Sequence, residues 1–390
     1  MGKERNAGVD LLRITSMFLV VLLHILGQGA LPADPFTAQY FAGWFLYAGA
    51  YCAVNCYALI TGYVMFESKF RISRLISLWF EVLFYAVIIT LGFWVLRPQT
   101  VGGSELLSMF FPVSNQYYWY FTAYCAMYFF VPVLNLAVEK LSRSQLRMLL
   151  AAIFVLFTVL PSVMQTDLFQ TYNGYSPVWL MVMYFIGAYL KKYGIPNPQK
   201  RIWYLGVYLV CSMLVWGSRA LGDWLISLGF DNINSNMMFN YTSPLIFGAG
   251  IGLFLFFASL RIRSPFALRC IGFFAPLSFG VYLIHTHPLV WWHWLPARFV
   301  RFAGLYLPLY LGAIFLAALA LYAVCSLADY LRALLFRVCR IHRLSEKLES
   351  LLLRALGRLS DRDDAAPAAK NPAAPTSAAA PCPAELPQLP

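Results

Sequence analysis

Long apolar stretches alternate with short polar links along most of the chain. Several stretches run for about 20 residues with hardly a charge, the length that an α-helix needs to cross roughly 30 Å of hydrocarbon. The pattern predicts helices at approximately 9–28, 40–66, 74–96, 117–137, 146–164, 176–192, 202–219, 240–260, 270–294 and 304–328. We therefore expect an all-α polytopic membrane protein with about ten transmembrane helices, which fill a membrane domain over residues 1–328.

Composition supports a membrane protein over a soluble one. Of the 390 residues, 61% are hydrophobic and only 12% are charged. A soluble domain of this size could not bury so much apolar surface. The formal charge of +12 raises the question of nucleic acid binding. However, the basic residues cluster in the links between apolar segments and in the C-terminal tail, a pattern typical of membrane topology, so we expect membrane lipids and no nucleic acid as partners.

The same basic residues predict the orientation of the chain. With the N-terminus on the cytoplasmic side, the cytoplasmic links and the N-terminus carry fifteen of them, whereas the opposite links carry only Arg97, Arg219, Arg298 and Arg301. Cytoplasmic loops of membrane proteins are enriched in Lys and Arg, so both termini are expected in the cytoplasm. The fifteen are Lys3, Arg5, Lys69, Arg71, Arg74, Lys140, Arg143, Arg147, Lys191, Lys192, Lys200, Arg201, Arg261, Arg263 and Arg269.

Beyond residue 328 the character of the chain changes. Residues 329–360 combine apolar positions at helical spacing with repeated arginines, which predicts an amphipathic helix on the cytoplasmic leaflet. A helix that binds a partner protein is the alternative. Residues 361–390 are rich in Ala and Pro and are expected to be disordered.

Two ionisable residues interrupt the first apolar segment. Arg13 and His24 are 11 residues apart, so on a helix they share one face and lie about 16 Å apart along the axis. Asp10 lies three residues before Arg13, on a neighbouring part of that face. Separately, His24 is compatible with simple helix packing and Arg13 with an anchor at the interface. Together they indicate a lined path from the cytoplasm to the middle of the membrane.

Two further intramembrane residues are candidates for the same site. Glu81 lies seven residues beyond Arg74, on about the same helix face and roughly 10 Å deeper. It either orients His24 or pairs with an arginine, and the sequence does not separate the two. His285 falls at a depth similar to that of His24, which makes contact between them feasible.

Five segments resemble the acyltransferase-3 family of membrane enzymes, which transfer acyl groups, usually acetyl, to bacterial surface sugars. They are "VDLLRITSMFLVVLLH", "CYALITGYVMF", "RISRLISLW", "YYWYFTAYCAMYFFVPVLN" and "IGFFAPLSFGVYLIHTHPL", in order along the chain. Thr61 stands where the family usually has Ser. The short chain, without an added extracytoplasmic domain, is most similar to the members that acetylate enterobacterial common antigen. The resemblance implies a multi-pass protein of the bacterial inner membrane.

The resemblance also implies a reaction. Acetyl-CoA would be the donor substrate, with no bound cofactor and no metal, and a saccharide or lipid-linked saccharide would be the acceptor. His24 would act as a general base or a transient acyl carrier, with Glu81 and His285 as further catalytic candidates. Arg13, Arg71 and Arg74, with Asp10 beside Arg13, would bind the donor, since guanidinium groups suit phosphates; Arg71 and Arg74 are equally compatible with simple anchoring at the interface.

The outer end of the fourth helix offers an acceptor site. Tyr117, Trp119 and Tyr120 lie there, either as an aromatic belt at the interface or as a platform for a sugar ring. A rival function is a transporter or flippase for a lipid-linked saccharide, which predicts inverted repeats and broken helices. The sequence shows neither clearly.

Overall fold

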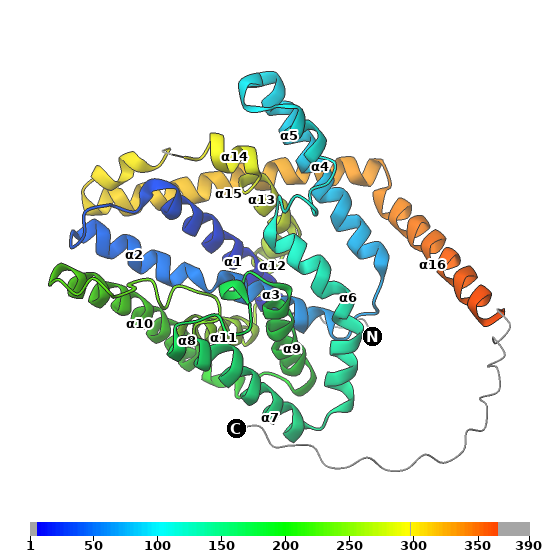
Figure 1. The fold of residues 1–390 in the computed structure, drawn as a ribbon, viewed down its shortest axis with the longest axis horizontal. Coiled ribbons are helices and arrows are strands. Elements are labelled where there is room, and N and C mark those ends of the chain that lie inside the picture. The colour runs from blue at the N-terminus through cyan, green and yellow to red at the C-terminus, as the bar shows by residue number, and fades with distance from the viewer. Residues whose placement is uncertain (1–5, 297, 366–390) are drawn as a thin grey trace, which may run out of the picture.

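A computed structural model describes residues 6–296 and 298–365, and within these ranges the chain forms helices and no strands (Figure 1). Each of the ten segments expected from the sequence contains a helix. The helices are α1 (Ala7–Ile25), η1 (Leu26–Ala30), α2 (Ala38–Tyr51), α3 (Ala53–Met65), α4 (Ile72–Leu96), η2 (Pro98–Thr100), α5 (Gly103–Ser108), α6 (Trp119–Lys140), α7 (Arg143–Phe154), η3 (Val155–Val159), α8 (Leu160–Met164), η4 (Tyr172–Gly174), α9 (Pro177–Tyr193), η5 (Pro198–Lys200), α10 (Arg201–Ser227), α11 (Pro244–Ala258), α12 (Pro265–Phe274), η6 (Ala275–Leu277), α13 (Ser278–His285), α14 (Pro288–His293), η7 (Val300–Gly304), α15 (Leu307–Val338) and α16 (Ile341–Ala365).

The helices in the ten expected segments differ in length. Within the described ranges, eight helical segments are long and apolar enough to cross a membrane. The other two expected segments are α9, with 17 residues, and α11, with 15 residues. Both are largely enclosed by their neighbours, and α9 alone buries ten of its residues. The protein is therefore an all-α polytopic membrane protein with eight candidate spans.

Helix ends that the sequence predicts on the same side of the membrane meet in space. The Asn6 side-chain amide at the start of α1 donates to the Ala258 carbonyl at the end of α11, at 3.0 Å. On the opposite side of the bundle, Arg97 at the end of α4 donates to the carbonyl of His293 at the end of α14, at 3.1 Å. We call these the inner and outer sides, because the first is the one predicted to face the cytoplasm.

Glycines allow the central helices to pack closely. A Cβ atom on Gly62 of α3 would collide with the Tyr184 carbonyl of α9, and one on Gly187 of α9 would collide with the Leu59 carbonyl of α3. Such backbone contact is typical of membrane helix pairs with small residues at the interface. The α3–α9 pair in turn packs on α1, α6 and α11. The core is thus a tight bundle with α1 near its centre.

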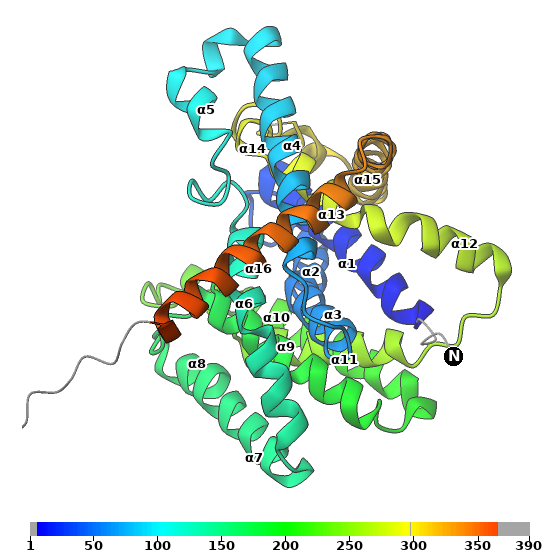
Figure 2. The ribbon, with the colours of Figure 1, turned by 90° about the vertical axis from the view of Figure 1, so that its right-hand side faces the viewer.

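The C-terminal region differs from the expectation at its boundary. Helix α15 continues past residue 328 to Val338, because Asp329 and Arg332 are held inside the bundle by the contacts described below. The chain then turns at Arg340, whose φ is 54°, into α16. Helix α16 packs across α4 (Figure 2). It extends to Ala365, and the rest of the predicted disordered tail lies outside the described residues.

Candidate functional site

A cavity of about 310 Å³ lies inside the bundle beside His24. Its walls come from α1, α2, α3, α6, α13 and α14, with Gly27 of η1 at its edge. The lining is mostly aromatic and aliphatic: Met17, Val20, Leu23, Tyr47, Ala50, Tyr51, Ala53, Val54, Tyr57, Trp119, Tyr120, Tyr175, Tyr241, Phe279, Tyr282 and Trp291. A largely apolar chamber with a few polar groups is the usual form of a small-molecule site.

His24 and His285 are in direct contact at this cavity. The Nδ1 atom of His24 lies 2.9 Å from Nε2 of His285, and Nδ1 of His285 lies 2.6 Å from the Val281 carbonyl oxygen. A carbonyl oxygen only accepts, so Nδ1 of His285 carries the proton of that bond. The Nε2 atom of neutral His285 is then an acceptor, and Nδ1 of His24 donates to it. The pair therefore fixes both tautomers.

This arrangement leaves the second nitrogen of His24 available. Its Nε2 has no hydrogen-bond partner among the described residues and is not enclosed by protein atoms. The Trp291 ring stands edge-on to the imidazole, with its centroid 4.8 Å away. The unprotonated Nε2 of a neutral imidazole accepts a proton. His24 thus presents a base to the cavity.

The predicted aromatic platform divides into two parts. Trp119 and Tyr120 line the cavity, whereas Tyr117 packs against His287, with ring centroids 5.5 Å apart. Trp119 lies 4.5 Å from Tyr175, centroid to centroid, which extends the aromatic wall. The sequence analysis missed other members of this wall, because they come from distant segments. The available signal was the spacing of Tyr47 and Tyr51, which are four residues apart on one face of α2. The missed members are Tyr47, Tyr51, Tyr175, Tyr241 and Trp291.

Glu81 pairs with an arginine, one of the two alternatives left open by the sequence. Its Oε1 accepts from Nη2 of Arg332 at 2.9 Å, and the same guanidinium binds Asp329 at 2.8 Å. The Tyr85 hydroxyl donates to Asp329 at 2.9 Å. Asp329 is fully buried against Gly280, where a Cβ atom would collide with the carboxylate. This buried network joins α4, α13 and α15, and it involves no contact with His24.

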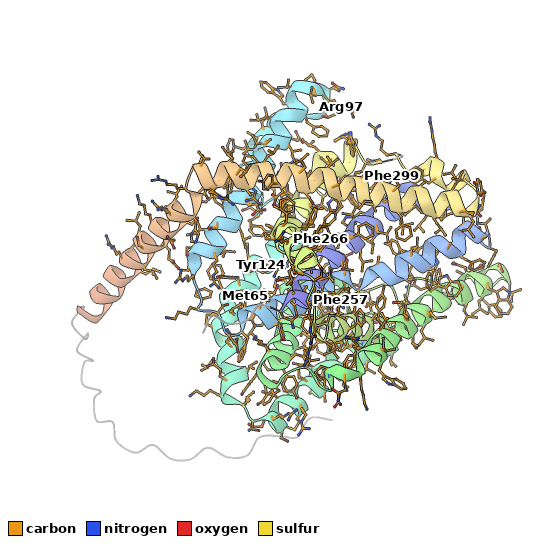
Figure 3. All side chains as sticks on the ribbon, turned by 180° about the vertical axis from the view of Figure 1, so that it is seen from behind. Met65, Arg97, Tyr124, Phe257, Phe266 and Phe299 are labelled. Carbon is orange, nitrogen blue, oxygen red and sulfur yellow. The ribbon has the colours of Figure 1, made fainter. Side chains whose placement is uncertain are left out.

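A second cavity opens on the inner side. It has a volume of about 580 Å³ and lies between α3, α4, α6, α15 and the start of α16. We call it the vestibule. Met65 and Tyr124, which lie side by side in Figure 3, form part of its wall. Arg74 lines the vestibule, whereas Arg71 is exposed outside it and interacts with Glu349.

Arg13 lies near tyrosines of both the vestibule and the His24 cavity. Its charge acts on the hydroxyl groups of Tyr57 and Tyr120, which line the His24 cavity, and on that of Tyr124, which lines the vestibule. The Tyr57 hydroxyl also donates to the Arg13 backbone carbonyl at 2.8 Å. Asp10 is buried in the first turn of α1, where a carboxylate interacts favourably with the helix dipole.

A third, polar cavity lies on the outer side. It measures about 430 Å³ and is separated from the His24 cavity by a backbone contact, in which the Tyr241 N–H donates to the Asn173 carbonyl at 3.0 Å. Its lining is mostly amides and hydroxyls: Ser162, Gln165, Thr166, Asp167, Asn173, Asn234, Asn236, Asn240 and Thr242, with Pro161, Met237 and Phe239. Across all described residues, no group of three or more His, Cys, Asp or Glu side chains is placed to hold a metal ion.

The fold and the site together define a multi-pass membrane protein with a histidine pair in an aromatic chamber. The chain belongs to the acyltransferase-3 family, because the acyltransferase domain of that family matches residues 6–328. The protein is therefore a membrane acyltransferase, as the sequence motifs predicted. No curated protein and no solved structure matches the chain. The matched region contains both His24 and His285 but ends before Arg332.

Proposed function

We propose that this membrane acyltransferase transfers an acetyl group from acetyl-CoA to a sugar hydroxyl, with His24 as the general base. The observation that carries the proposal is the geometry of His24. His285 holds its Nδ1 at 2.9 Å, while its Nε2 faces an aromatic chamber deep inside a chain of this family. A base that is fixed at one nitrogen and free at the other meets the geometric requirement for general base catalysis.

The reaction follows from that geometry. Nε2 of His24 takes the proton of the acceptor hydroxyl as the oxygen attacks the thioester carbonyl carbon. The tetrahedral intermediate then collapses, the carbon–sulfur bond breaks, and the CoA sulfur leaves with the proton that His24 had taken. His24 is transiently an imidazolium, and its Nδ1–H bond to His285 becomes charge-assisted. An acyl group carried for a moment on Nε2 is the alternative course.

Two arginines support a donor from the inner side. Arg74 lines the vestibule, and Arg13 lies near Tyr120 of the His24 cavity and Tyr124 of the vestibule. Along α1, Arg13 and His24 are separated by 11 residues, or about 16 Å. In the proposal, the phosphates of CoA stay in the vestibule while the acyl end passes Arg13 to reach His24. The acetyl group is the part that crosses the membrane.

The outer cavities favour a carbohydrate acceptor. Trp119 and Tyr120 offer aromatic faces, and the neighbouring polar cavity offers amides and hydroxyls that hydrogen-bond sugar hydroxyls. Asp223, an outer-side carboxylate, is already engaged by Arg219 at 2.7 Å. An acceptor of the enterobacterial common antigen type and a place in the bacterial inner membrane, with both termini in the cytoplasm, are parts of the proposal that rest on the motifs quoted above.

The proposal is tested with purified protein in lipid nanodiscs, radiolabelled acetyl-CoA and a panel of alkyl hexopyranosides. Wild-type protein is expected to form an acetylated glycoside, from which hydroxylamine removes the labelled acetyl group as the hydroxamate. His24→Ala is expected to bind CoA without transfer, and Arg13→Ala to bind it more weakly. If folded wild-type protein binds no CoA, the donor assignment fails, and a saccharide flippase becomes the better account.

A further inference from the structure

The vestibule contains residues that lie beyond the matched family domain. The domain ends at residue 328, yet Arg332, Phe336 and Arg337 of α15 and Ile341 and His342 of α16 line this cavity. They follow from the continuation of α15 to Val338 and from the turn that brings the start of α16 back toward α4. The C-terminal segment is thus part of the cavity wall.

Helix α16 is held in place by specific contacts. Ser345, which is fully buried, bonds to Ser77 of α4, with 2.9 Å between their hydroxyl oxygens. One turn later, the Glu349 carboxylate interacts with the N–H groups of Ile72 and Ser73 in the first turn of α4. That helix end has no side-chain cap of its own, so Glu349 supplies the missing acceptor. Figure 2 shows the resulting course of α16 across α4.

The charge of the vestibule is unbalanced. The carboxylate of Glu81 is neutralised by Arg332, which also binds Asp329. Arg74 and Arg337 line the same cavity, and neither forms a salt bridge within the described part of the chain. Two guanidinium groups that form no salt bridge, in a cavity of about 580 Å³ whose lining carboxylate, Glu81, is bound by Arg332, favour a multiply charged anion such as a phosphate ester.

We propose that residues 332–342, at the end of α15 and the start of α16, complete the donor site, with Arg337 and Arg74 binding the phosphates of CoA and with Ile341 and His342 closing the wall around them. This inference rests on the proposed function for the identity of the donor. The shared chemistry is a phosphate group, and an anionic lipid headgroup carries it as well. CoA is the occupant that we infer, because the vestibule lies next to the His24 cavity: Tyr124 of the vestibule and Tyr120 of the His24 cavity are one turn apart on α6.

The test measures equilibrium binding in nanodiscs, so it does not depend on turnover. The ligands are CoA, its phosphorylated fragment adenosine 3′,5′-bisphosphate, and pantetheine, which lacks the phosphates. Arg337→Gln is compared with Arg343→Gln, which makes the same charge change at an exposed position of α16 outside the vestibule. Both side chains are exposed, so both variants are expected to fold.

Arg337→Gln is expected to weaken binding of CoA and of the bisphosphate about tenfold, since charge-assisted hydrogen bonds are lost. Pantetheine binding should not change, and Arg343→Gln should match wild type for all three ligands. Equal effects of the two variants, or an equal effect on pantetheine, would overturn the inference.

A second pair of nanodiscs, of neutral lipid and of lipid with added phosphatidylglycerol, separates the two phosphate sources. If Arg337→Gln weakened CoA binding in anionic lipid but not in neutral lipid, the vestibule would be assigned to a lipid headgroup. That result would contradict the inference. The proposed function has a separate failure, which is absence of acetyl transfer by protein that binds CoA normally.

Discussion

Replacing His285 by leucine tests whether this residue works through His24. Leucine has no acceptor for the proton on Nδ1 of His24, which is 2.9 Å from His285 Nε2 in the wild-type protein. The imidazole of His24 is then free to adopt the other tautomer, in which Nε2 carries the proton and is no longer a base. We therefore expect a lower turnover number with little change in CoA binding, because His285 does not line the cavity.

The size of this loss follows from the hydrogen bond. A neutral hydrogen bond contributes about 0.5–1.5 kcal/mol and one to a charged group about 1.5–3 kcal/mol. The His24–His285 bond passes from the first kind to the second when His24 takes a proton, so it stabilises the transition state more than the ground state. Adding the cost of the wrong tautomer, we expect a loss of about 1–3 kcal/mol, or roughly 5- to 150-fold in turnover.

The assay is a double-mutant cycle on acetyl transfer, with His24→Ala, His285→Leu and the combined variant. His285→Gln is the matched control, since its amide oxygen can accept from His24, and it should recover a large part of the activity. If His285 acts through His24, adding His285→Leu to His24→Ala causes no further loss. A combined loss equal to the product of the two single losses would refute this reasoning, because it would mean that the residues act independently.

Three other predictions concern the cavity, the buried network and α16. Gly27→Leu should abolish turnover, because Gly27 lines the His24 cavity and the leucine side chain would fill it. Thermal stability should change little, because a Cβ atom at this position meets no protein atom within 4 Å. A retained rate would show that substrates do not use this chamber. Gly280→Ala should destabilise the protein by about 1–3 kcal/mol in a denaturation series, because the methyl group collides with Asp329; unchanged stability would contradict the packing. Burial opposes ionisation of Glu349, but hydrogen bonds from Ser73 and Ile72 outweigh it and lower its pKa below the ordinary 4.5. The ionised carboxylate therefore holds α16 against α4 above pH 4.5, and α16 should be released as the pH falls through the lowered pKa. Hydrogen exchange in α16 measures this release. Glu349→Gln should remove this pH dependence, and exposed Glu346→Gln should keep it.

The sequence predicted the parts of the fold that depend on local pattern. Runs of apolar residues revealed the ten segments in which the helices of the bundle lie. Membrane helices form their backbone hydrogen bonds internally, so an apolar composition is enough to recognise them. Two of these segments, α9 and α11, form helices of only 17 and 15 residues, which pack in the interior. The predicted end of the last apolar helix at residue 328 was too early, because α15 continues to Val338 and its Asp329 and Arg332 pair inside the bundle.

The candidate site was partly accessible from spacing along a helix. The shared face of Arg13 and His24 pointed to a path within the membrane, and the depth of His285 made its contact with His24 feasible. The partner of Glu81 was beyond reach, because Arg332 lies 251 residues away and is brought close only by the packing of α15 on α4 and α13. For the same reason Tyr175 and Tyr241 could not be assigned to the cavity, since only packing brings the segments before α9 and α11 to it.

The most direct test of the account is the single-turnover rate of acetyl transfer to an alkyl hexopyranoside by His24→Ala protein saturated with acetyl-CoA, measured beside its CoA affinity. We predict an affinity close to that of wild type and a rate about 10²- to 10⁴-fold lower, the usual contribution of a general base. A variant that transfers acetyl at the wild-type rate would contradict the account, because the chemistry would then be performed elsewhere in the protein.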